Sequence, residues 1–124
     1  MSEKKKYAFR RFVYIVIPTN DWNFLCLSNV DNFPFVENNS DSLEEDFARF
    51  KKEFLEKYNI NFSDYILWYK IFRYHNACDM TFYLFKKIEK IPILENTRLV
   101  HASELQGWSE PIQHIMRFYE KQYK

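Results

Sequence analysis

Two carboxylates and a lysine lie within five residues of one another and form the group in this sequence best suited to chemistry. Glu53 and Glu56 are three residues apart, and Lys57 follows directly. On a helix, side chains three or four residues apart approach to about 5–6 Å, so both carboxylates can converge on one cation. The ammonium of Lys57 has no lone pair to give to a metal. The three residues therefore form a metal site, a site altered by its lysine, or a solvated helix face.

A helix is expected to position these side chains, because apolar residues recur around them at helical spacing. The apolar stripe consists of Leu43, Phe47, Phe50, Phe54 and Tyr58, which are four, three, four and four residues apart. Ser42 and Glu45 fit a capping box, so the helix is expected to begin near Leu43 and to run to about Tyr58. Asn59 then tolerates the left-handed conformation that commonly ends a helix.

Apolar segments on both sides of this helix predict strands. The run at 12–17 is unbroken and β-branched, which is typical of a strand covered on both faces. The run at 24–27 is the next strand, so the two are expected to pair as a hairpin. Residues 29–39 are expected to form a loop. Two segments rich in strand formers, 65–74 and 80–85, predict a second hairpin.

The end of the chain predicts a short strand and a second helix. The strand is expected at 98–101, after a charged connection, and Ser109, Glu110 and Pro111 carry the signals of a helix start. The apolar face of this helix consists of Ile112, Ile115, Met116, Tyr119 and Tyr123. The order of elements predicts an α+β fold in which a mixed sheet is held between two helices.

The composition predicts one domain over residues 1–124, with a basic tail at 1–6. The 124 residues are 47% hydrophobic and 20% aromatic, enough for one core. The formal net charge of +1 gives no overall attraction to nucleic acid or to an anionic membrane. A single glycine excludes glycine-rich phosphate loops. No apolar run approaches the roughly 18 residues of a membrane-spanning helix, so no membrane partner is expected.

The cysteines and histidines indicate a reducing compartment and no zinc site. Cys26 and Cys78 are too few for a disulfide framework, and each is expected to be a small buried hydrophobe. Free thiols are typical of the cytoplasm or another reducing intracellular compartment. His75, His101 and His114 share no ligand spacing.

Aromatic residues are the candidates for stacking on a nucleotide base. The four considered are Phe33, Phe35, Trp68 and Tyr69. Packing in the core is the commoner role for aromatic rings in a chain so rich in them.

The stretch from Asn38 to Ile60 resembles the box that defines the Nudix family. That box reads Gly, five residues, Glu, seven residues, then Arg-Glu-U-x-Glu-Glu-x-Gly-U, where U is a bulky aliphatic residue. Laid on it without gaps, this sequence matches at Glu44, Glu53, Glu56 and Ile60, with Phe54 at the first U. The segment 99–105, LVHASEL, is similar to the family's Trp-Val-x-x-x-Glu-Leu ending.

The departures from the box are as informative as the matches. Asn38 and Asn59 replace its two glycines, Lys52 replaces the Arg, and Lys57 replaces the second Glu of the pair. A shifted start, with Asp41 at the helix entry, needs about three inserted residues and leaves Lys57 where it is.

The resemblance implies a Nudix-like α+β fold and a metal on the box helix. In active members, Mg²⁺ or Mn²⁺ bound by the box carboxylates assists water in attacking a diphosphate that links a nucleoside to another group. The residues so implied here are Glu53 and Glu56, catalytic if the protein is active, assisted by Glu44 and by Glu89 or Glu95. A like charge about 4 Å from the metal costs roughly 4 kcal/mol at an effective dielectric of 20, so a lysine weakens such a site.

We therefore expect a Nudix-fold protein with weakened or lost hydrolase activity. Its expected ligand is a nucleotide, a nucleoside-diphosphate-linked molecule, or an RNA or protein partner. One alternative is an active, divergent hydrolase dependent on Mg²⁺ or Mn²⁺. The other is a non-Nudix α+β interaction domain in which Glu53, Glu56 and Lys57 are a solvated face. The aromatic richness also makes a homodimer an option.

Overall fold

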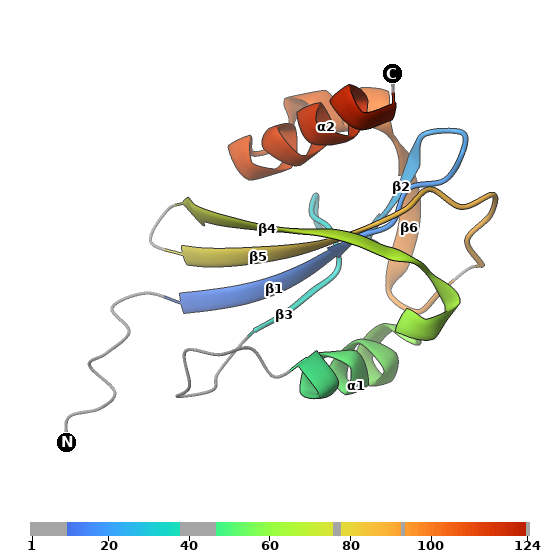
Figure 1. Ribbon diagram of the computed structural model, residues 1–124, viewed down its shortest axis with the longest axis vertical. Coiled ribbons are helices and arrows are strands. Elements are labelled where there is room, and N and C mark those ends of the chain that lie inside the picture. The colour runs from blue at the N-terminus through green and yellow to red at the C-terminus, as the bar shows by residue number, and fades with distance from the viewer. Residues whose placement is uncertain (1–9, 38–46, 76–77, 93, 124) are drawn as a thin grey trace.

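A four-stranded sheet between two helices forms the centre of the molecule (Figure 1). The structure is a computed structural model that describes residues 10–37, 47–75, 78–92 and 94–123. The strand order is β3-β1-β5-β4. The elements of this assembly are β1 (Arg10–Val16), β3 (Phe35–Glu37), α1 (Phe47–Tyr58), β4 (Leu67–His75), β5 (Cys78–Phe85) and α2 (Glu110–Tyr123). β1 is parallel to β5 and antiparallel to β3, so the expected mixed sheet is confirmed.

The first predicted hairpin is wrong, because β2 (Asn23–Leu27) leaves the sheet that contains β1. β2 pairs antiparallel with β6 (Thr97–His101) in a separate two-stranded sheet. β1 is bordered on both sides, by β3 and β5, so its edges are already taken. The two predicted hairpin segments remain in contact next to the turn between them, where the Leu25 N–H donates to the Ile17 carbonyl at 3.1 Å.

The predicted loop at 29–39 contains a strand, and this is a second correction. β3 is three residues long and pairs Val36 with Val13 of β1. A strand of this length shows no alternation that a sequence pattern could reveal. The second hairpin, β4 with β5, is confirmed as an antiparallel pair, and β6 and α2 lie where they were expected.

The core has two halves, one on each face of the central sheet. Side chains alternate along β1, so that Val13 and Ile15 face α1 while Tyr14 and Val16 face α2. The α1 half includes Phe50, Phe54 and Tyr58 of the predicted stripe, and the α2 half includes Ile112, Ile115, Met116 and Tyr119. These parts of the two predicted apolar faces are buried as expected, whereas Phe47 at the start of α1 is 38% exposed. The side chain of Tyr123 is outside the described part of the chain.

The end of α1 follows its prediction, and its start lies outside the described residues. Asn59 adopts a φ of 62°, and its N–H donates to the Leu55 carbonyl at 2.9 Å, which closes the helix. Leu43 and the capping box of Ser42 and Glu45 fall in the segment that is not described.

Two 3-10 helices, η2 (Phe62–Asp64) and η3 (Ala102–Gly107), complete the fold. Both cysteines are free thiols, and Cys26 is buried as expected, whereas Cys78 is only half-buried. Burial raises the pKa of the Cys26 thiol to about 12. None of the described helices is both long and apolar enough to span a membrane.

Candidate functional site

The hydroxyl of Tyr58 joins the last turn of α1 to the start of β3. It donates to the Phe35 carbonyl at 2.8 Å and accepts from the Phe35 N–H at 3.3 Å. The side chain is only 1% exposed, so both hydrogen bonds are sheltered from water. Tyr58 thereby fixes the distance between the charged face of α1 and the residues that follow Phe35.

A cavity of about 370 Å³ lies between these two elements. Its lining consists of Val36 and Glu37 from β3 and of Glu53, Glu56 and Lys57 from α1. The structure thus brings together the two carboxylates and the lysine that the sequence singled out. It adds a third carboxylate, Glu37, from a strand that the sequence did not predict.

Two of the three carboxylates in the cavity are engaged by arginines. Arg10 binds Glu37 through two parallel hydrogen bonds of 2.8 and 2.7 Å. These hydrogen bonds hold the pKa of Glu37 below its usual value and raise that of Arg10. Arg49 binds Glu53 at 2.8 Å from one helical turn away. Each pair cancels a negative charge that a divalent cation would otherwise neutralise.

Lys57 is exposed, and its ammonium lies against aromatic rings. The Nζ atom is 5.5 Å from the ring centroid of Phe35 and 5.4 Å from that of Tyr58. Both distances are within the range of cation–π attraction. The positive charge therefore stays at the α1–β3 junction, beside the carboxylates of the cavity.

The described residues do not fit a divalent metal ion. Within the described ranges, no group of three or more His, Cys, Asp or Glu side chains is placed to hold a metal. Mg²⁺ requires near-octahedral oxygen ligands, and one oxygen of Glu53 already accepts from Arg49. Glu44, which the Nudix resemblance implies as a further ligand, lies outside the described residues.

None of the other described residues that the resemblance implies is among those that line the cavity. Lys52 is exposed on α1 but does not line the cavity, and Asn38 is not described. Glu89 and Glu95 lie in the connection after β5, and neither contributes to the lining. The turn that holds Glu95 nevertheless touches α1, because Asn96 Nδ2 donates to the Lys57 carbonyl at 3.4 Å.

The aromatic candidates for base stacking are mostly packed inside the molecule. Phe33 is fully buried, so the expectation that it could stack on a base is wrong. Trp68 packs against Phe118 and Tyr119 of α2. Tyr69 is 51% exposed, but it lies on β4 at the edge of the sheet.

Three residues of this site, Glu37, Arg10 and Arg49, were not identified from the sequence. The Arg49–Glu53 pair had a readable signal, since the two residues are four apart on a helix. Arg10 and Glu37 are 27 residues apart, and only the pairing of β1 with β3 brings them together.

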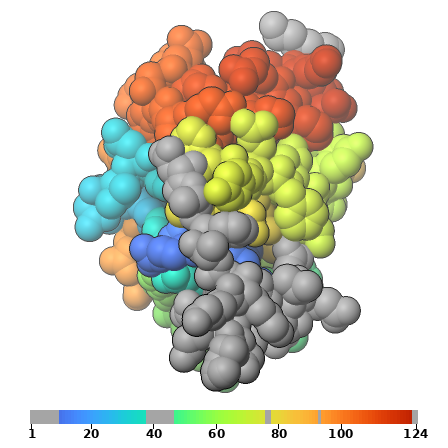
Figure 2. Space-filling view, turned by 90° about the vertical axis from the view of Figure 1, so that its left-hand side faces the viewer, coloured from blue at the N-terminus to red at the C-terminus, as the bar shows by residue number. Residues whose placement is uncertain are grey.

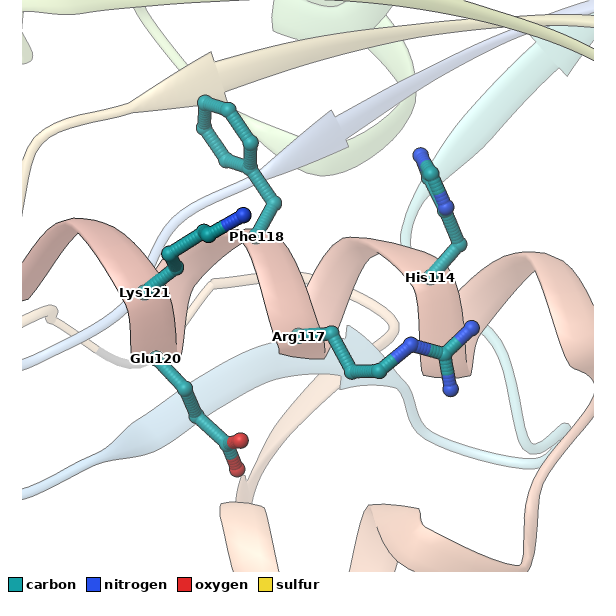
Figure 3. A pocket seen from close by; sticks show the side chains of 5 residues that line it. All are labelled: His114, Arg117, Phe118, Glu120 and Lys121. Carbon is teal, nitrogen blue, oxygen red and sulfur yellow. The ribbon is translucent and has the colours of Figure 1, made fainter.

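A second cavity, of about 520 Å³, lies over α2 on the other face of the sheet. Its lining side chains, His114, Arg117, Phe118, Glu120 and Lys121, all arise from one helix (Figure 3). Phe118 and Glu120 point away from each other, so the groups do not converge on one ligand (Figure 3). Burial and the charge of Arg73 lower the pKa of His114. The α1–β3 cavity, where polar groups from two elements meet, is therefore the better candidate.

Comparison with known proteins identifies the fold. No protein-family model matches the sequence, and no curated protein sequence matches it. A NUDIX hydrolase from Nitrosomonas europaea superposes with a TM-score of 0.55 at 12% identity, covering 94% of this chain and 91% of that one. An Ap4A hydrolase from C. elegans has a TM-score of 0.56 at 13% identity, covering 92% and 98%. A binary complex of a C. elegans Ap4A hydrolase gives 0.55 at 13% identity, covering 90% and 96%.

At these identities the likeness is one of fold. The chain has a Nudix-like α+β fold, as the sequence led us to expect. The alternative of a fold unrelated to Nudix proteins is therefore wrong.

Proposed function

We propose that this chain binds a nucleotide or a nucleoside-diphosphate-linked ligand at the α1–β3 cavity, with hydrolase activity weakened or lost. The Nudix-like fold supports a ligand of this class, because two of the similar structures are named as hydrolases of Ap4A. One observation carries the loss of activity. Two of the three carboxylates that line the cavity are paired with arginines, Glu53 with Arg49 and Glu37 with Arg10.

The charges around the cavity balance without a metal ion. Each of the two paired carboxylates has its own arginine, and the ammonium of Lys57 lines the same cavity as Glu56. A carboxylate cluster needs a bound cation chiefly when its charges are otherwise uncompensated. Since much of this compensation comes from the chain itself, we expect the site to gain less from a bound metal than an unpaired carboxylate cluster would.

The helix that lines the cavity carries an excess of positive charge, which attracts an anionic ligand to this side of the molecule. The described residues of α1 carry four basic side chains against two acidic ones, a net charge of +2. The basic residues are Arg49, Lys51, Lys52 and Lys57. Of these, Lys57 lines the cavity, and Arg49 is paired with Glu53. Ammonium and guanidinium groups bind phosphate oxygens directly through charge-assisted hydrogen bonds. A diphosphate held in this way is bound but lacks the metal ion that activates it in working Nudix enzymes.

An active, divergent hydrolase is the second candidate, and one observation favours it. Glu53 and Glu56 line the same cavity, where both can face one ligand. In that case Mg²⁺ or Mn²⁺ would need further donors, for which Glu44 and Glu95 are the proposed residues.

A screen with and without Mn²⁺ separates the two candidates. The ligands are nucleoside triphosphates, ADP-ribose, dinucleoside polyphosphates and capped RNA, with binding followed by calorimetry and hydrolysis by chromatography. We expect binding of at least one ligand that is unchanged by EDTA, with no turnover at high protein concentration. Turnover that depends on Mn²⁺ and is lost in Glu53→Gln would establish the hydrolase instead. Absence of binding to every ligand would remove the nucleotide proposal.

We also propose that the chain works in a reducing compartment such as the cytoplasm. The free thiols of Cys26 and Cys78 support this placement.

A further inference from the structure

Exposed apolar side chains are concentrated along β4 and the residue before it. Of the nine large hydrophobic residues that are exposed in the described part of the chain, five lie between positions 66 and 74. They are Ile66, Leu67, Tyr69, Phe72 and Tyr74, with exposed fractions of 63, 44, 51, 64 and 61%. Isolated exposed hydrophobic residues are ordinary, but a contiguous group marks an interaction surface.

β4 also forms an edge of the sheet. It is nine residues long, and among the described strands it pairs on one side only, with β5. Figure 2 shows its yellow-green atoms at the surface beneath the red atoms of α2. A long edge strand offers backbone groups for pairing with another strand. β4 also carries Lys70, Arg73 and an irregularity between Leu67 and Tyr69, which a paired strand has to accommodate.

Charge argues against nucleic acid as the occupant of this edge. Arg73 is held by Glu110 of α2 through contacts of 2.6 and 2.7 Å, so its charge is compensated within the chain. The whole chain has a net charge of only +1. Proteins that bind single-stranded nucleic acid on aromatic rings also need a positive groove along the phosphates.

We propose that β4 pairs with β4 of a second copy of this chain, antiparallel and centred on Ile71. The resulting two-fold interface joins two four-stranded sheets into one continuous sheet. In this register Phe72 lies opposite the partner's Lys70. By symmetry, Lys70 lies opposite the partner's Phe72. Directly opposed side chains on paired strands are about 4.5–5.5 Å apart at Cβ, so the ammonium reaches the ring that it faces.

Contacts within one chain already show that this lysine is attracted to aromatic rings. Lys70 Nζ is 5.4 Å from the ring centroid of Phe72 and 5.8 Å from that of Tyr83. Both distances are within the range of cation–π attraction. The ammonium of Lys70 therefore already lies on the face of the sheet where a phenylalanine of a second copy would be placed opposite it.

Symmetry, charge and strand length favour Ile71 as the centre. Opposed side chains must lie on the same face of the sheet. One residue of β4 therefore lies directly opposite its own copy in the partner, and the two-fold axis passes midway between these two copies. A centre on Lys70 or on Arg73 would place two like charges directly opposite each other, which is destabilising. Ile71 is also the middle residue of β4, so this centre gives the two strands their longest overlap, with the irregularity between Leu67 and Tyr69 at the end of the paired stretch.

The exposed area is sufficient for a weak dimer. Aromatic side chains present about 150–250 Å² each when fully exposed, so the exposed fractions of Tyr69, Phe72 and Tyr74 correspond to roughly 350 Å² per protomer, to which Ile66 and Leu67 add a smaller area. Two copies would then bury at most about 1,000 Å², the minimum that a specific interface requires. We expect a dissociation constant on the order of micromolar.

Sedimentation equilibrium over a concentration series tests the proposal. The wild-type chain should dimerise, and Phe72→Lys should weaken dimerisation at least tenfold, because the introduced ammonium faces the partner's Lys70. The side chain of Phe72 is largely exposed, so the fold should tolerate the change. Leu99→Lys, at a residue of β6 that is 46% exposed, is the matched control and should leave dimerisation within about twofold.

A charge exchange tests the register by the same measurement. The double variant Lys70→Glu with Phe72→Lys should restore dimerisation to within about threefold of the wild type. The lysine introduced at position 72 then faces the glutamate introduced at position 70 of the partner, and only the register centred on Ile71 opposes these two positions.

A disulfide provides a second, independent measurement of the register. In a background of Cys78→Ser, Ile71→Cys places two thiols directly opposite each other. Opposed residues on antiparallel strands are about 4.5–5.5 Å apart at Cα, a separation that a disulfide spans. Mild oxidation should give a covalent dimer, and Leu99→Cys in the same background should not. Cys26 is buried and should not react.

Several results would overturn the proposal, and none depends on what the α1–β3 cavity binds. A wild-type chain that stays monomeric at every concentration rules out the dimer. Equal effects of Phe72→Lys and Leu99→Lys rule out the β4 edge, and failure of the double variant to restore dimerisation rules out the register. A monomer that binds a labelled oligonucleotide through Tyr69 would assign the surface to nucleic acid instead.

Discussion

The lysine at the α1–β3 cavity can be tested by reversing its charge. Lys57→Glu places a carboxylate where the Nudix box has one and removes an ammonium from the lining of the cavity. The side chain is exposed, so the substitution should not disturb the core. It gives up the contacts with the rings of Phe35 and Tyr58, at 5.5 and 5.4 Å. We expect the variant to bind Mn²⁺ more tightly than the wild type.

The magnitude follows from charge and exposure. Two unit charges about 4 Å apart interact by roughly 1 kcal/mol at the dielectric of water and by about 4 kcal/mol at an effective dielectric of 20. Because Lys57 is exposed, the value for water applies, and salt with a Debye length of about 8 Å reduces it further. The reversal changes the local charge by two units and acts on a divalent ion. A gain of about 1.4 kcal/mol or more, a factor of ten in the dissociation constant, is the expected minimum.

Titration calorimetry with Mn²⁺ provides the measurement, and α1 supplies its own control. Lys52→Glu makes the same charge change on the same helix, at an exposed residue that does not line the cavity. It should raise the affinity by much less than Lys57→Glu. Adding Glu53→Gln to Lys57→Glu should remove the gain in Mn²⁺ affinity, because the ion would then lose the Glu53 carboxylate as a ligand. Arg49→Gln in the same background should increase the gain by releasing Glu53 from its ion pair.

Two outcomes would refute the reasoning. Equal gains in Mn²⁺ affinity for Lys57→Glu and Lys52→Glu would show that only the net charge of the helix matters and not the position of the lysine in the cavity. No gain in Lys57→Glu, even with Arg49→Gln, would show that the carboxylates of the cavity are not arranged around a cation position.

Three further predictions concern the elements that hold the site together. Asn59→Ala should destabilise the fold by about 1–2 kcal/mol in urea denaturation, because alanine disfavours the φ of 62°, whereas Asn59→Gly should not; equal losses in both would point to the side chain instead. Tyr58→Phe should cost about 1–3 kcal/mol, since both of its hydrogen bonds to Phe35 are lost, and an unchanged unfolding curve would contradict their importance. The pKa of Glu37 is lowered in the folded chain by Arg10, so its contribution to stability is present above the usual value of 4.5 and lost as the pH falls below it. Glu37→Gln should therefore reduce the fall in melting temperature between neutral and acid pH, measured by thermal denaturation. A fall identical to that of the wild type would show that the Arg10–Glu37 pair does not cause it.

Local patterns in the sequence were sufficient for much of the fold. The stripe of Phe50, Phe54 and Tyr58 predicted which face of α1 is buried, because helical spacing alone places these side chains on one side. Asn59 was identified as the helix end for a similar reason, since few residues adopt a positive φ at low cost. The β4–β5 hairpin joins neighbouring segments and was likewise predictable.

Tertiary structure alone decided the strand pairing and the charges of the cavity. Nothing local indicates that β2 pairs with β6 or that β3 borders β1, because partners in a sheet are chosen by competition for edges across the whole chain. Glu37 and Arg10 meet only through that pairing. The sequence by itself placed Glu53, Glu56 and Lys57 on one helix and identified the lysine as a departure from the Nudix box. The structure decided what surrounds them, because ion pairs between distant residues depend on the register of strands that no spacing in the sequence encodes.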